Sequence, residues 1–147
     1  MSVVLTAAYL AGPVAAWLIA HAERRQVIVR DYLAIVLRHG LTHGYVDTIA
    51  DRTAVAIWYP RPAPALTCQY QRAMTHATGP YAAVFGLATA LFESHHPDLP
   101  HHYLAYLAVH PDHQGQAHAS ILVNHHRHLD SIGRAGSAAN GVATARR

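Results

Sequence analysis

The stretch YLAYLAV, residues 103–109, decides the fold. It is a nearly unbroken apolar run, and the turn residues His110, Pro111 and Asp112 follow it directly. A short apolar run with such boundaries is typical of a buried strand rather than of a helix. The pattern therefore predicts a central β-strand over these residues.

The residues after this strand predict a loop and then a helix. The stretch QGQAHA, residues 114–119, contains only small and polar residues. Beyond it, apolar residues share one helical face, and a glycine suited to a C-cap follows them. These residues are Ile121, Leu122, Leu129, Ile132 and the glycine Gly133. The predicted order is strand, small-residue loop and helix.

This order can form an anion site. The first N–H groups of a helix have no backbone partner and lie at the positive end of its dipole. The small residues Gly115, Ala117 and Ala119 would let a diphosphate approach those groups. The loop contains neither G-x-G-x-x-G nor G-K-S/T, which excludes the dinucleotide fingerprint and the P-loop. A plain turn without a ligand is the alternative interpretation.

Residues 107–120, LAVHPDHQGQAHAS, resemble the acetyl-CoA-binding segment of the GNAT superfamily of N-acetyltransferases, whose pattern is Q/R-x-x-G-x-G/A. Gln114 and Ala119 match this pattern, whereas Ala117 stands where the family has glycine. One methyl group at that position could crowd the pyrophosphate.

Further segments resemble the branch of this family that includes puromycin N-acetyltransferase. They are AYLAGPVAAWL at residues 8–18 and AVAIW at residues 54–58. Together with HP at 96–97 and YL at 103–104, they extend the similarity from about residue 7 to residue 133.

The resemblance implies an α/β (α+β) fold with a mixed central sheet flanked by helices. It also implies transfer of an acetyl group from acetyl-CoA to a primary amine of a small molecule or peptide. Backbone N–H groups in the loop would bind the pyrophosphate, the backbone of Leu107 and Val109 would pair with the pantetheine arm, and the Val109 N–H would face the acetyl carbonyl. The implied cofactor-binding residues are Leu107, Ala108, Val109, Gln114, Gly115, Gln116, Ala117, His118 and Ala119.

The proton-transfer residues are less defined by the sequence. Glu93 could act as the general base through a water molecule, although a carboxylate at a helix end can also be simply solvated. His101 and His102 are further candidates, because histidine changes charge near neutral pH. The family's thiolate-protonating tyrosine would lie beyond Gly133, where this chain has no tyrosine. Tyr103 and Tyr106 are interpreted as packing residues.

Both ends depart from the family pattern. Residues 134–147 contain a single Val and no Leu, Ile, Phe, Tyr or Trp, which predicts a disordered tail without a strand. The family's first strand has no counterpart, and neither do the parallel strand, helix and closing hairpin that the family has after the helix ending at Gly133. We therefore expect one GNAT-like domain over residues 1–133, truncated at both ends. A noncatalytic remnant is the alternative to an active enzyme, and an exposed edge at residues 103–109 would favour a homodimer.

The remaining patterns predict further elements. Helices are expected over residues 3–10, 13–22, 26–39, 69–77 and 81–94, and strands 45–50 and 53–59 form a hairpin. Pro60 is expected to end the second strand, because proline lacks an N–H donor. The helix over residues 81–94 is expected to present Val84, Leu87, Ala88 and Leu91 to the core.

Composition indicates a single globular domain of 147 residues, 52% hydrophobic and 13% charged. The net charge of +3 includes no cluster of basic and aromatic residues, so no nucleic-acid partner is expected. Cys68 is the only cysteine, which favours a reducing, cytoplasmic compartment, and we expect it to be buried and inert. The apolar run at residues 3–20 is interrupted by Gly12-Pro13, and no basic segment precedes it. It therefore predicts two core helices rather than a membrane span.

Fourteen histidines raise a second hypothesis, a metal-binding or pH-responsive protein. The pairs at 95–96 and 101–102 and the stretch HHRH at 125–128 are dense enough to catch Zn or Ni. However, no Cys or carboxylate accompanies His125 and His128 at a structural-site spacing, and H-E-x-x-H is absent. Adventitious surface binding is therefore favoured, and no metal site is predicted.

Overall fold

The computed structural model describes residues 1–63, 65–131 and 142–145, and the side chains of these up to residue 129. Its centre is a four-stranded sheet in the order β3-β2-β1-β4, in which every pair is antiparallel. The strands are β1 (Tyr45–Ile49), β2 (Ala54–Arg61), β3 (His101–Val109) and β4 (Val142–Ala145). The predicted α/β (α+β) class, a central sheet flanked by helices, is confirmed, but the expected mixed sheet is not, because all the described strand pairs are antiparallel.

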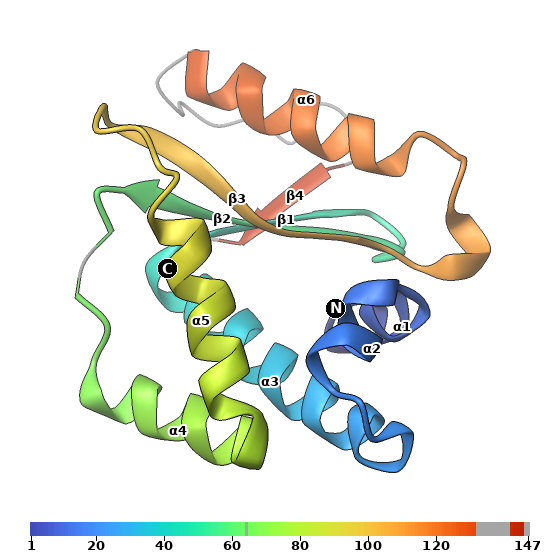
Figure 1. Cartoon of the computed structure of the whole chain (residues 1–147). Helices are drawn as coiled ribbons and strands as arrows, with labels where there is room; N and C mark the ends of the chain where they lie inside the picture. The colour runs from blue at the N-terminus through green and yellow to red at the C-terminus, as the bar shows by residue number, and fades with distance from the viewer. Residues whose placement is uncertain (64, 132–141, 146–147) are drawn as a thin grey trace.

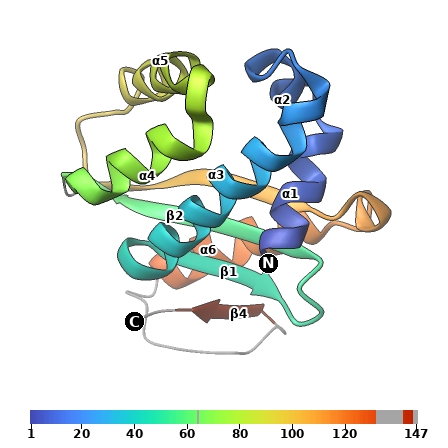
Figure 2. The same cartoon turned by 90° about the horizontal axis from the view of Figure 1, so that it is seen from below.

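Helices cover both faces of the sheet (Figure 1). One face carries α1 (Ser2–Ala11), α2 (Pro13–Leu18), α3 (Ala22–His43), α4 (Cys68–Thr78) and α5 (Ala82–Glu93), and the other carries α6 (His118–Ser131). Figure 2 shows α3 running between the α1–α2 pair and the α4–α5 pair. Two short 3₁₀ helices, η1 (Gly79–Tyr81) and η2 (Pro111–His113), precede α5 and α6.

The core lies on both sides of β2, whose residues 54–58 are all buried. Because side chains alternate along a strand, Val55 and Ile57 pack toward the five-helix layer, while Trp58 packs toward α6 with Leu122. The predicted hairpin of β1 and β2 is confirmed, and its register pairs Tyr45 with Trp58.

The end of β2 differs from the prediction. The strand does not stop at Pro60 but continues to Arg61, and Pro60 pairs with His102 of β3. In the described register, β1 pairs with β2 only as far as Trp58. Beyond that residue β2 has a partner on one side only, so a residue without an N–H donor fits there.

Helix α5 also departs from expectation. Leu87 and Leu91 are 70% and 58% exposed, and Val84 is 37% exposed, whereas Phe85 is the buried residue of this helix. The sequence of α5 is apolar almost all round, so its pattern could not identify the face that a neighbour would cover. Cys68, predicted to be buried, is exposed at the start of α4.

The C-terminal segment contains a strand that the composition did not predict. Val142–Ala145 form β4 and pair antiparallel with β1, so the prediction of a tail without a strand is wrong for these residues. Pairing at a sheet edge relies on hydrogen bonds between main-chain N–H and C=O groups, which residues with small side chains carry like any others. The predicted helix cap, Gly133, lies outside the described residues. In the part of the chain that the structure describes, no helix has both the length and the apolarity of a membrane span.

The turn from α3 into β1 supplies a test of this packing. A Cβ atom on Gly44 would clash with the backbone carbonyl oxygen of Trp58, which cannot give way as a side chain can. We expect Gly44→Ala to lower the free energy of unfolding by roughly 1–3 kcal/mol in urea denaturation.

Gly86→Ala is the matched control, because a Cβ at Gly86 in α5 meets no atom within 4 Å. This variant should be unchanged or more stable by up to about 1 kcal/mol, since alanine favours helix. Equal stability of the two variants would contradict the packing at Gly44.

Candidate functional site

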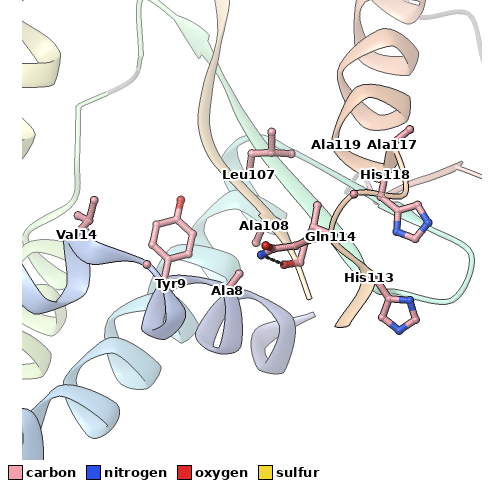
Figure 3. Close-up of a pocket in the computed structure, with 13 residues that line it drawn as sticks. Ala8, Tyr9, Val14, Leu107, Ala108, His113, Gln114, Ala117, His118 and Ala119 are labelled. Atoms are coloured by element: carbon pink, nitrogen blue, oxygen red, sulfur yellow. Dashed lines mark hydrogen bonds between the residues drawn. The ribbon is translucent and has the colours of Figure 1, made fainter. Parts of the chain in front are cut away.

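A cavity of about 720 Å³ lies where β3 ends and α6 begins (Figure 3). Three segments form its wall: α1 with the start of α2, the end of β3, and the loop that leads into α6. The first segment contributes Ala8, Tyr9, Gly12 and Val14. The other two contribute Leu107, Ala108, Val109, His113, Gln114, Gly115, Ala117, His118 and Ala119.

The structure brings together nearly all residues that the sequence assigned to cofactor binding. Every one of them lines the cavity except Gln116, which is exposed beside it. The sequence did not assign the α1 residues or His113 to this wall. The sequence predicts helices over this segment and residues 8–18 resemble the family, but no local pattern indicates that α1 lies beside β3.

The edge of β3 presents main-chain groups to the cavity. The N–H of His110 donates to the carbonyl oxygen of Thr53 at 2.8 Å, so this pair is directed toward β2. Because the direction alternates along an antiparallel strand, Leu107 and Val109 direct their N–H and C=O groups away from β2. The side-chain amide of Gln114 donates to the Val109 carbonyl oxygen at 3.4 Å, in agreement with this alternation.

The loop after η2 uses left-handed backbone at two positions. Gly115 has φ of 79° and Ala117 has φ of 60°. The first helical hydrogen bond of α6 runs from the N–H of Ile121 to the carbonyl oxygen of Ala117 at 3.0 Å. The N–H groups of residues 118–120 therefore have no partner one turn earlier in the helix, and His118 and Ala119 bring two of them to the cavity wall.

Tyr9 extends from α1 into the wall of the cavity (Figure 3). Burial raises the pKa of Tyr9 to about 12, and a hydrogen bond with the Leu107 backbone partly offsets this rise. Its ring lies 6.0 Å from that of Tyr106, whose hydroxyl is 2.7 Å from the hydroxyl of Tyr32. The phenol of Tyr9 is thus protonated at neutral pH and held against the β3 edge.

The cavity wall has imidazoles but no permanent charge. Among the described residues that line it, none is Lys, Arg, Asp or Glu, whereas His113 and His118 place their rings 6.1 Å apart. An anion at this site would therefore meet N–H donors and imidazoles rather than a fixed cation.

The candidate bases lie elsewhere in the structure. Both carboxylate oxygens of Glu93 accept hydrogen bonds from the Arg61 guanidinium, each at 2.6 Å. This pairing lowers the pKa of Glu93, and neither residue lines the cavity. His101 contacts His96 at 3.4 Å, again away from the cavity wall.

His102 belongs to a different, buried cluster between the sheet and α6. Its Nδ1 lies 3.3 Å from Nε2 of His126, and Nδ1 of His126 lies 2.8 Å from a carboxylate oxygen of Asp47. Asp47 and His126 are 0% and 2% exposed. Within residues 1–63 and 65–129, no group of three or more His, Cys, Asp or Glu side chains is arranged to hold a metal ion.

The left-handed backbone of Ala117 leads to a prediction about stability. An alanine in this region is strained by roughly 1–2 kcal/mol, and glycine is not. Since glycine also loses more chain entropy on folding, Ala117→Gly should raise the free energy of unfolding by a net of about 0.5 kcal/mol. Urea denaturation measures this change.

Gly115→Ala is the matched opposite change in the same loop. It introduces a side chain at φ of 79° and should lower the free energy of unfolding by about 1 kcal/mol. Destabilisation by Ala117→Gly would show that the loop is not strained at Ala117.

Comparison with known proteins agrees with the geometry of this site. The model of the acetyltransferase (GNAT) family matches residues 43–128, which is more than half of the chain. The matched region runs from the end of α3 through the β3 edge and the loop into α6. No curated protein matches the chain at a significant level. With the family matched over its strand, loop and helix, this chain belongs to the GNAT family of acetyltransferases.

Proposed function

We propose that this chain is an acetyl-CoA-dependent N-acetyltransferase that acts on a primary amine of a small molecule or peptide. One observation carries the proposal: the residues that line the cavity include both β3 residues with outward main-chain groups and first-turn residues of α6, whose N–H groups have no partner within the helix. The resemblance of residues 8–18 and 54–58 supports a place in the branch that includes puromycin N-acetyltransferase. The single, unpaired Cys68 supports a cytoplasmic location.

The start of α6 fits the diphosphate of acetyl-CoA. Its N–H groups lie at the positive end of the helix dipole, and the small side chains of Gly115, Ala117 and Ala119 leave them accessible. The described wall contains no carboxylate that would repel a diphosphate. Ala117 occupies a left-handed conformation, which favours the glycine that the family pattern has at this position.

The β3 edge fits an extended amide-containing arm. Leu107 and Val109 direct N–H and C=O groups away from β2 at the spacing of alternate strand residues, as an added β-strand would require. An arm bound here would replace the Tyr9 hydroxyl at the Leu107 backbone and the Gln114 amide at the Val109 carbonyl oxygen. A pantetheine arm carries amides that can use these groups. Its bound position would continue from the diphosphate along β3.

Acetyl-CoA supplies the activated acetyl group as a thioester. The Val109 N–H is proposed to donate to the acetyl carbonyl, where negative charge develops when the amine attacks. The tyrosine hydroxyl of Tyr9 stays protonated beside Leu107, so it closes the cavity without adding charge. Glu93 remains a candidate base only if its carboxylate leaves Arg61.

The diphosphate site can be tested by placing a carboxylate in it. Ala119→Glu puts a negative charge in the first turn of α6. The helix dipole stabilises a carboxylate there, but the carboxylate repels a diphosphate. We expect calorimetry to show acetyl-CoA binding to the wild-type chain and at least tenfold weaker binding to this variant.

Ala83→Glu is the control for that substitution. Ala83 is exposed and is the second residue of α5, as Ala119 is of α6, but it lies outside the cavity wall. Affinity should match the wild type. Equal weakening by both variants, or no binding by the wild type, would refute the proposed site.

Turnover separates an active enzyme from a noncatalytic remnant. We expect release of the CoA thiol when acetyl-CoA is mixed with a panel of antibiotic, polyamine and peptide amines. Glu93→Gln should change kcat by less than about threefold, because Arg61 engages both oxygens of this carboxylate outside the cavity. A loss of 100-fold or more, within the range of general-base catalysis, would instead identify Glu93 as the base. Binding without thiol release from any amine would favour the remnant.

A further inference from the structure

A chain of hydrogen bonds orients His118 at the cavity. The Asp51 carboxylate, in the turn between β1 and β2, accepts from both the backbone N–H and the hydroxyl of Thr53, at 3.0 and 2.8 Å. The same hydroxyl oxygen lies 3.3 Å from Nδ1 of His118. The three residues form a continuous connection from the turn to the first residue of α6.

This connection determines which ring nitrogen is free to meet a ligand. A hydroxyl has one proton, and that of Thr53 is directed to Asp51, so its oxygen accepts from Nδ1–H of His118. Nε2 is then the nitrogen that gains or loses a proton. When neutral it is an acceptor, which an anion avoids, and when protonated it is a charged donor, which an anion favours.

Several charged and titratable groups surround the two imidazoles. Asp51 remains ionised, because its hydrogen bonds with Thr53 and the nearby His118 and His113 lower its pKa. Just before η2, Nδ1 of His110 lies 3.7 Å from a carboxylate oxygen of Asp112, and the His110 ring lies 6.0 Å from that of His113. From α1, only the neutral phenol of Tyr9 reaches the cavity wall among the titratable groups.

We propose that His118 and His113 bind the diphosphate of acetyl-CoA as imidazolium groups, so that affinity rises as the pH falls. Figure 3 shows both rings beside the loop that carries Gln114. The inference rests on the proposed function and adds to it a titratable charge, in a wall whose described residues hold no Lys or Arg. Asp51 and Thr53 act as positioning residues, since they hold His118 in the tautomer that exposes Nε2.

The test uses 3′-dephospho-acetyl-CoA and calorimetry at about pH 6 and about pH 8. This probe lacks the phosphate monoester, which changes its own charge near pH 6, and its thiol is masked by the acetyl group. The wild-type chain should bind it about tenfold more tightly at the lower pH, as one charge-assisted hydrogen bond would provide. In the double variant His113→Gln, His118→Gln this ratio should fall to less than about twofold.

Two further variants sharpen the result. Thr53→Val removes the connection to Asp51 and should reduce the pH effect, whereas His76→Gln, exposed on α4, should retain it. A wild-type affinity that is the same at both pH values, or a pH effect that survives the double variant, would overturn the inference and leave the proposed function intact. No binding of this probe or of acetyl-CoA at either pH would overturn both.

Discussion

The burial of β2 on both faces is the constraint on which the rest of the structure depends. Five consecutive residues, 54–58, are at most 6% exposed, and they alternate between the two helical layers. Burying a side chain such as Ile57 or Val55 contributes roughly 1.5–3 kcal/mol, and this gain requires a covering layer on each side. The chain must therefore supply helices for both faces of the sheet, and α6 is the only described helix on its face.

The position of α6 then follows from one buried polar contact. His126 lies 2.8 Å from Asp47 of β1, and its ring stacks on Trp58 with centroids 3.9 Å apart and planes at 7°. Separating two buried polar groups leaves each without its partner, which costs more than the contact itself contributes. The helix therefore cannot slide along the sheet without a large penalty. Because α6 is rigid, the same contact fixes its first turn, and with it the N–H groups of the cavity, beside the end of β3.

Local sequence patterns predicted the parts of the site that are contiguous in the chain. The strand expected at 103–109 is β3, and the loop and helix follow it in the predicted order. Apolar runs, small residues and turn residues act over a few positions, so they can be interpreted without tertiary structure. The placement of Tyr9 in the cavity wall and the Thr53–His118 contact both join residues far apart in the sequence. The periodicity of apolar residues in a helix or strand does not predict such contacts. The exposed face of α5 and strand β4 were mispredicted for the same reason, because each depends on which neighbour is present.

The two edges of the sheet differ in what can pair with them. Strand β4 pairs with β1, whereas β3 forms the opposite edge of the described sheet. A register shift occurs where Ile57 pairs with Tyr106 and Trp58 with Leu104, so Ala105 is an additional residue that interrupts the ladder. A long partner strand would have to shift its register at this bulge, as β2 does, while a short arm opposite Leu107 and Val109 need not cross it. A homodimer formed at the β3 edge would use these same N–H groups. Edge pairing and binding of a pantetheine arm therefore compete, and each would weaken the other by mass action.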